Sequence, residues 1–216
     1  MNEARIRFDI VDVICVVAAL ILFVMALQSY LVTDRLKYQL YTGLFSALMC
    51  LLPMLLKHGR VISIPAPLVL FIELAIFLHG YGVLLMQYDN MAWYDSVTHT
   101  ISSIVVGLCA FYILLEANRP GGSLDLGPTG MSMFLVLIMM TFSVYWEVFE
   151  LFVDLLAGTN MQYSPFDTTR DMLSNALGGF IASAYARYFM KRHPHYDVAE
   201  EFRMHPYIRR LLSSKT

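Results

Sequence analysis

The chain has 216 residues, of which 58% are hydrophobic and 15% are charged. Soluble domains are about 45–50% apolar and about 25% charged, so this composition excludes an ordinary soluble protein. A net charge of −2 gives no basis for nucleic-acid binding, which relies on basic surfaces.

The hydrophobic residues are concentrated in six long blocks, and a helix needs about 20 such residues to cross the hydrocarbon core of a bilayer. The predicted spans are 11–32, 38–56, 64–86, 95–115, 131–156 and 170–190. Basic residues precede the first block, but no small-residue cleavage site follows it, so we expect this block to remain as the first span. The sequence therefore predicts an all-α membrane protein, a bundle of about six transmembrane helices.

The segments outside the spans are polar or rich in glycine and proline, which is typical of connections between helices. Residues 191–216 form a polar tail of mixed charge that we expect to be solvated in the cytoplasm. Within it, residues 198–212 can also form a short amphipathic helix on the membrane surface. The cysteines occur singly inside apolar blocks, which predicts buried thiols: Cys15, Cys50 and Cys109.

The Lys and Arg residues are divided unequally between the two sides of the predicted bundle. With six spans both termini lie on the same side, and twelve of the 15 basic residues fall there. The opposite side has three, namely Arg35, Lys37 and Arg170. Because cytoplasmic loops are enriched in basic residues, we predict a multi-pass protein of the cell membrane with both termini in the cytoplasm.

Polar residues in the last three predicted spans fall at similar depths below the outer surface. The fourth and sixth spans begin at this surface, and the fifth ends there. The residues concerned are Asp95 and His99, Glu147 and Glu150, and Asp171 and Asn175. In the fifth span, Ser143, Glu147, Glu150 and Asp154 have the spacing of one helical stripe. We expect this stripe to face the bundle interior, because a charge that faces lipid costs several kcal/mol.

The acids near this layer outnumber the cations, which are Arg170 and His99. The acids are Asp95, Glu147, Glu150, Asp154, Asp167 and Asp171, and Glu73 and His79 of the third span are further candidate members. Such carboxylates in a low dielectric must share protons, pair with Arg170 or hold a cation. Oxygen ligands with one imidazole suit a divalent Mg, Mn, Fe or Zn ion. The candidate metal ligands are Asp95, His99, Glu147, Glu150, Asp167 and Asp171.

Three functional hypotheses use these residues. An enzyme acting on a lipid-linked or envelope substrate would use Glu147 or Glu150 as a general base and His99 as a ligand or acid. Arg170 and Asn175 are then candidate substrate-binding residues, since an arginine can bind a phosphate or a carboxylate. A proton- or cation-coupled transporter would use the same carboxylates as a relay. In a structural or partner-binding membrane protein, the polar network would only lock the helices together.

Four motifs, in order, give the chain a resemblance to the YjdF-like bacterial and archaeal membrane proteins, a family of uncharacterised function. They are FLHGYG at 77–82, YDSVTH at 94–99, YWEVFE at 145–150 and FDTTRDMLSNALG at 166–178. The resemblance covers about residues 65–185. More remotely, the last three motifs are similar to those of VanZ-like proteins, which are associated with glycopeptide-antibiotic resistance and tend to have Gln at the position of Glu150. Both resemblances imply a multi-pass membrane protein, and neither implies a reaction.

Overall fold

The structure is a computed structural model that describes residues 7–33 and 37–212. These residues form helices joined by turns, with no strand among them. Within these described ranges, five segments are helical, long and apolar enough to cross a membrane: Ile10–Leu31, Tyr38–His58, Ala66–Leu84, Tyr94–Ala117 and Pro128–Leu156. The predicted all-α membrane fold is confirmed.

The sixth predicted span falls on α8 (Pro165–Arg192), which is not among those five segments. This helix has 28 residues, more than the length a crossing needs, but charged residues near both ends lower its hydropathy. It begins earlier than predicted, because the Ser164 hydroxyl accepts a hydrogen bond from the Asp167 N–H and Pro165 suits the first helical position. That α8 crosses the membrane stays a prediction. So does the orientation, for which Arg5, Arg35 and Lys215 lie outside the described residues.

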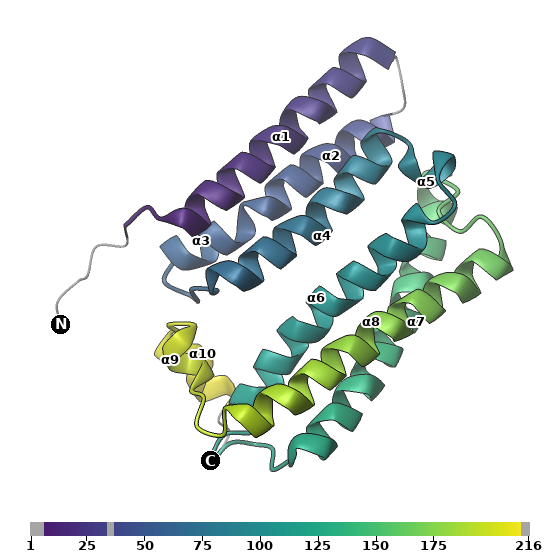
Figure 1. The fold of residues 1–216 in the computed structure, drawn as a ribbon. Helices are drawn as coiled ribbons and strands as arrows, with labels where there is room; N and C mark the ends of the chain where they lie inside the picture. Colours follow the sequence, from purple (N-terminus) through teal and green to yellow (C-terminus); the bar gives the residue numbers. More distant parts are fainter. Residues whose placement is uncertain (1–6, 34–36, 213–216) are drawn as a thin grey trace. The chain divides into compact units, whose positions relative to one another are not determined.

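The chain divides into two compact units, Met1–Tyr94 with Asp197–Ser214, and Asp95–Tyr196. In the first unit, α1, α2 and α4 run side by side (Figure 1). Its first five helices are α1 (Ile10–Thr33), α2 (Lys37–Cys50), α3 (Leu52–His58), α4 (Ala66–Leu84) and α5 (Gln87–Asn90). Pro53 separates α2 from α3, because proline has no N–H to continue the helical hydrogen bonds. Cys15 and Cys50 are buried here as free thiols, as predicted.

A cluster of charged residues ties α1 to α3. We call it the Asp12–Lys57 cluster, and its members are Asp9, Asp12, Lys57 and His58. Asp12 is fully buried, and its carboxylate accepts from Lys57 Nζ at 2.6 Å and contacts His58 Nε2 at 3.0 Å. Lys57 also lies 2.8 Å from Asp9 Oδ1. Burial raises the pKa of Asp9, but hydrogen bonds from Lys57 and the Val11 N–H outweigh burial and lower it below the usual 3.8.

The C-terminal tail forms two short helices, α9 (Val198–Glu201) and α10 (Pro206–Leu212). Part of this tail is not solvated, in contrast to our prediction. Val198 and Phe202 are buried, and the Ser63 N–H donates to the Phe202 carbonyl at 2.7 Å. The His205 N–H donates to the Val61 carbonyl at 2.9 Å. The tail therefore docks on the segment between α3 and α4 through backbone hydrogen bonds.

In the second unit, α6 (Tyr94–Ala117), α7 (Pro128–Ala157) and α8 pack together (Figure 1). Their core contains Phe111, Met131, Leu135, Met139, Ala182, Ala186 and Phe189. Two glycines allow α8 to approach its neighbours closely. A Cβ at Gly178 would lie 2.5 Å from the Thr100 carbonyl oxygen of α6, and one at Gly179 would lie 2.8 Å from Met139 Cβ of α7. Both glycines therefore face a neighbouring helix.

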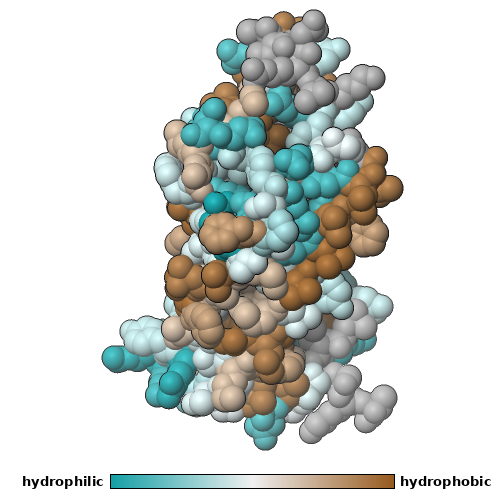
Figure 2. Space-filling view, turned by 90° about the vertical axis from the view of Figure 1, so that its right-hand side faces the viewer, coloured by the Kyte–Doolittle hydropathy of each residue, from teal (hydrophilic) through white to brown (hydrophobic). Residues whose placement is uncertain are grey.

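Large hydrophobic side chains lie exposed along the long helices. They include Phe45, Leu70, Ile113, Leu137 and Leu173. Figure 2 shows hydrophobic residues spread over the face that it draws, interleaved with polar ones. A soluble monomer rarely exposes extensive apolar surface, whereas a bilayer solvates it, so this surface agrees with a membrane location.

Candidate functional site

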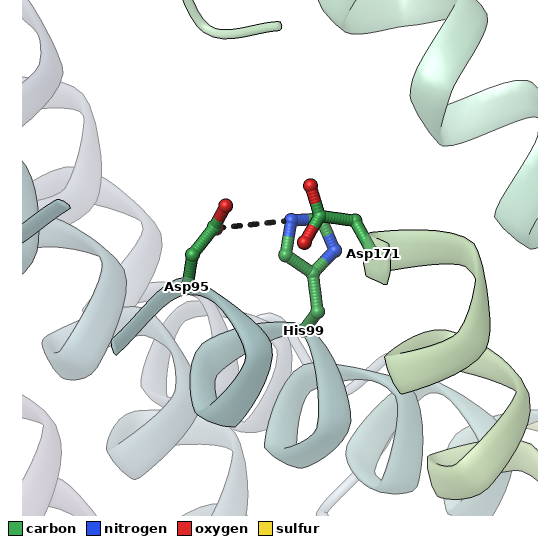
Figure 3. Close-up of side chains that lie close together, drawn as sticks. All are labelled: Asp95, His99 and Asp171. Carbon is green, nitrogen blue, oxygen red and sulfur yellow. Dashed lines mark ion pairs between the residues drawn. The ribbon is translucent and has the colours of Figure 1, made fainter. Parts of the chain in front are cut away.

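The second unit brings together the predicted site residues of α6, α7 and α8. Two groups of potential metal ligands share one histidine: Asp95, His99 and Asp171 form the first, and His99, Glu147 and Glu150 form the second. Within each group the ligand atoms lie within 4.8 Å of one another, and all five residues are buried. In Figure 3, the side chains of Asp95 and His99 on α6 and of Asp171 on α8 approach one another. We call these five residues, with Asp167 and Arg170, the acidic cluster.

Helical spacing explains how each helix contributes to the acidic cluster. Asp95 and His99 are four residues apart at the beginning of α6, so they lie on one face. Glu147 and Glu150 are one turn apart on α7 and both are buried. The remaining residues follow the N-terminus of α8, where the Ser164 cap fixes the first turn.

His99 is held by a chain of hydrogen bonds that joins α6 to α8. Its Nδ1 lies 3.2 Å from Asn175 Oδ1, and the Ser103 hydroxyl donates to the same oxygen at 2.7 Å. Because this amide oxygen can only accept, Nδ1 carries a proton. The other ring nitrogen, Nε2, lies 3.3 Å from Asp95 Oδ1. Nε2 therefore either donates a proton to Asp95 or faces it with its lone pair, and the second arrangement requires a proton on Asp95 or a cation between the two atoms.

Arg170 forms ion pairs with three acids of the acidic cluster. Its Nη2 bonds to Asp167 Oδ1 and lies 3.5 Å from Asp95 Oδ2. Its Nε lies 3.8 Å from Asp171 Oδ1. Arg170, predicted to bind substrate, is thus already engaged by carboxylates. Asn175, the other residue predicted for that role, orients His99.

Several buried oxygens of this site have no hydrogen-bond partner among the described residues. Neither carboxylate oxygen of Glu147 has one, although the residue is only 5% exposed. Three further groups also lack a hydrogen-bond partner among the described residues: Asp171 Oδ1, Asp167 Oδ2 and the Ser143 hydroxyl. Since a buried oxygen without a partner costs free energy, these groups indicate that the acidic cluster is incomplete as it stands.

Four other predicted residues belong to neither metal-ligand group, and the first of them, Asp167, is bound by Arg170. Asp154 instead binds the loop after α7, where it accepts from the Thr159 hydroxyl at 2.6 Å and the Met161 N–H at 2.7 Å. Glu73 and His79 belong to the first unit, where Glu73 is buried in α4 and His79 Nδ1 lies 3.1 Å from the Tyr88 hydroxyl. We therefore leave Asp154, Glu73 and His79 out of the candidate site.

Two polar contacts of the site were missed at the sequence level. Trp146 Nε1 donates to Glu150 Oε1 at 3.0 Å, and the spacing of four residues on one helix was the available signal. Gln162, in the loop before α8, donates from Nε2 to the Glu147 backbone carbonyl at 2.7 Å. No pattern in the sequence marks this second contact, because it depends on how the loop folds back over α7.

Comparison with known proteins agrees with the membrane character of this fold. The sequence pattern of a family described as "Predicted membrane protein (DUF2238)" matches residues 13–192, which include most of both units and every residue of the acidic cluster. Searches of curated proteins and of solved structures gave no match. The matched region covers most of the chain. The chain therefore belongs to the DUF2238 family of predicted membrane proteins.

Proposed function

We propose that the acidic cluster holds one divalent cation and that this centre is the active site of a membrane enzyme acting on a lipid or envelope substrate. The observation that carries the proposal is Glu147, a buried carboxylate with two unpartnered oxygens beside an oriented histidine. The resemblance to YjdF-like and VanZ-like proteins covers the same residues and supplies no reaction, so the chemistry rests on the geometry.

His99 has the arrangement expected of a metal ligand. Ligating histidines usually donate their second ring N–H to a protein acceptor, and here Asn175 Oδ1 accepts from Nδ1. The Nε2 lone pair is then free for the ion. Two ligands in a tetrahedral site with bonds of about 2.0–2.2 Å lie about 3.4 Å apart. The 3.3 Å between His99 Nε2 and Asp95 Oδ1 fits a cation between them.

The two ligand groups are best explained by one ion rather than two. Because Nδ1 is committed to Asn175, His99 offers only Nε2, and one imidazole nitrogen binds one metal ion. This one nitrogen is then shared by Asp95 and Asp171 of the first group and by Glu147 and Glu150 of the second. A ligand set of carboxylate oxygens with one imidazole suits Mg, Mn, Fe or Zn.

The charges of the acidic cluster support the same conclusion. Five carboxylates share this buried site, and Arg170 supplies one permanent positive charge. A divalent ion and Arg170 together would balance three carboxylates, and the others would keep protons. Without an ion, more of these acids must be protonated, because unpaired charges are costly in a low dielectric.

The same residues can support hydrolytic chemistry. A bound divalent ion makes a water molecule acidic enough to become a nucleophile near neutral pH. Because neither oxygen of Glu147 has a partner, one can bind the ion while the other accepts the proton of that water as a general base. Glu150 accepts a hydrogen bond from Trp146, so as a metal ligand it is held in place more firmly than Glu147. The membrane location favours a substrate that is itself a lipid or is attached to one.

One observation favours a purely structural network as the second candidate. Arg170 contacts Asp95 on α6 and two acids on α8, and the His99–Asn175–Ser103 contacts also join these helices. Such a network would hold α6 against α8 without any ion. It does not explain the unpartnered oxygens of Glu147, which lies on α7.

Elemental analysis of the purified protein tests the proposal. We expect about one divalent ion per chain in the wild type and a clear loss in Glu147→Gln, which keeps the shape of the side chain. Glu201→Gln is the matched control, because Glu201 is an exposed carboxylate of the first unit. Metal-loaded wild-type protein should then convert a species in an extract of envelope lipids, followed by mass spectrometry. A metal without conversion would contradict the enzyme, and no metal in any form would favour the structural network.

A further inference from the structure

The second unit has a groove between α7 and α8 that lies far from the acidic cluster. Its volume is about 460 Å³, within the range of about 300–1,000 Å³ of small-molecule pockets. The lining residues are Ser132, Phe180, Ser183, Ala184, Arg187, Tyr188 and Lys191. Ser132 lies in the second turn of α7 and Lys191 in the last turn of α8, whereas the acidic cluster lies near the opposite ends of both helices.

The groove contains two cations and no acid. Among the described residues, neither Arg187 nor Lys191 makes a hydrogen bond or an ion pair, and both are exposed. Lys57 and Arg209, by contrast, pair with Asp12 and Asp197. Two unpaired cations in one groove attract an anion.

The polarity of the groove changes along its length. Lys191 and Arg187 lie at the end of α8, and Phe180 lies about 16 Å from Lys191 along the helix axis. Between them, the Ser183 and Ser132 hydroxyls lie 2.6 Å apart and bond to each other's backbone carbonyls, which leaves this part of the groove small and uncharged. Phe180 is 56% exposed and gives the far end an apolar wall.

We propose that this groove binds one anionic phospholipid. The phosphate lies between Arg187 and Lys191, and an acyl chain runs past the serines toward Phe180. A charged end and an apolar end about 16 Å apart match the head and chain of a lipid better than a free phosphate, which would use only the two cations. Anionic lipids are plentiful at the cytoplasmic surface, where the charge distribution of the sequence places these residues.

Lipid binding to the detergent-solubilised full chain tests this proposal. Native mass spectrometry would count bound phosphatidylglycerol, with phosphatidylcholine as the zwitterionic comparison. We expect one phosphatidylglycerol per chain and clearly weaker binding of phosphatidylcholine. Arg187→Gln/Lys191→Gln should weaken binding about tenfold or more, because each basic residue near an anionic lipid contributes about fivefold.

The matched control is Arg7→Gln/Arg203→Gln, which removes the same charge from two exposed positions outside the groove. This control should change the affinity by less than about twofold. Equal losses in both double variants would overturn the proposal, because they would indicate general attraction to basic surfaces. Equal competition by glycerol phosphate would also overturn it, since the acyl chain would then contribute nothing. The selectivity of the wild type for phosphatidylglycerol gives a result even if a variant fails to fold.

Discussion

Each unit of the chain buries a cluster of charged residues between helices, but the two clusters differ in how their carboxylates are satisfied. In the Asp12–Lys57 cluster, both oxygens of Asp12 have partners: Lys57 and the Asp9 N–H at one oxygen and His58 at the other. In the acidic cluster, Glu147 has no hydrogen bond at either oxygen, and acids outnumber cations.

Folding alone explains why the Asp12–Lys57 cluster is buried, but it does not explain the acidic cluster. Asp12 and Lys57 balance each other and join α1 to α3, so their burial needs no ligand. The acidic cluster holds like charges close together, which destabilises the fold unless protons or a cation compensate. Sites that bind or react often keep such unfavourable arrangements at the expense of stability. Four experiments, each on one unit or on both, test whether the two clusters differ in this way.

The largest expected effect concerns the side of the membrane that each cluster faces. The distribution of Lys and Arg predicts that the Asp12–Lys57 cluster lies near the cytoplasmic surface and the acidic cluster near the outer surface. Reporter fusions at Asn90 and Asn160 should therefore give an outside signal, and fusions at Gly122 and the C-terminus an inside signal. An outside signal from the C-terminus would mean that α8 does not complete a sixth crossing.

Removing one acid from each cluster should have opposite effects on stability. Asp12→Asn leaves Lys57 buried without its main counter-charge and should cost about 3–5 kcal/mol. Glu147→Gln removes a carboxylate that lies beside other acids and has no hydrogen bond at either oxygen in the metal-free protein, so the unfolding midpoint should stay or rise. Thermal unfolding in detergent with a chelator measures both. Similar decreases of the unfolding midpoint in the two variants would show that the two clusters contribute to stability in the same way.

The close contact of α8 with α6 should be sensitive to a single methyl group. Gly178→Ala places a Cβ 2.5 Å from the Thr100 carbonyl oxygen and should cost about 1–3 kcal/mol, because a backbone atom cannot move away cheaply. Gly130→Ala is the control, since its Cβ would meet only Leu126 at 3.6 Å or more. Thermal unfolding in detergent compares the two glycine variants. An equal midpoint for both variants would show that α6 and α8 are not held this closely.

The smallest effect is expected from Asp9, the exposed member of the Asp12–Lys57 cluster. Asp9 is half exposed, so Asp9→Asn should cost at most about 1 kcal/mol near neutral pH. Because the pKa of Asp9 in the folded protein is below 3.8, its contribution is present above that pH and disappears as the pH falls through the folded value. The unfolding midpoints of the wild type and the variant should converge in acid. A difference between the two midpoints that stays constant as the pH falls would contradict the ion pair between Asp9 and Lys57.

Much of the second unit could be predicted, because helical period and chain reversal determine which residues share a face and a depth. These two regularities brought Asp95, His99, Glu147, Glu150 and Asp171 into one expected layer, and the structure places them in two touching groups. α8 begins earlier than the span predicted for it, because the first turn after the Ser164 cap is charged and does not continue the apolar pattern.

Contacts between residues distant in the sequence could not be predicted in this way. Lys57 directly follows the second predicted span, where its charge indicates only a loop, whereas its pairing with Asp12 depends on the packing of α1 against α3. Docking of the tail on residues 61–63 uses backbone hydrogen bonds, which leave no trace in side-chain patterns. The ion pairs of Arg170 follow from side-chain conformation, which composition and spacing do not fix.

X-ray absorption at the zinc edge, on protein loaded with one equivalent of Zn²⁺, tests the central claim most directly. We predict one imidazole nitrogen and carboxylate oxygens at about 2.0–2.2 Å, with the imidazole signal lost in His99→Ala. This result would place the ion in the acidic cluster of the second unit. Sulfur ligands at about 2.3 Å would instead point to cysteines such as Cys15 and Cys50 of the first unit, and either that spectrum or a failure to retain zinc would contradict the account.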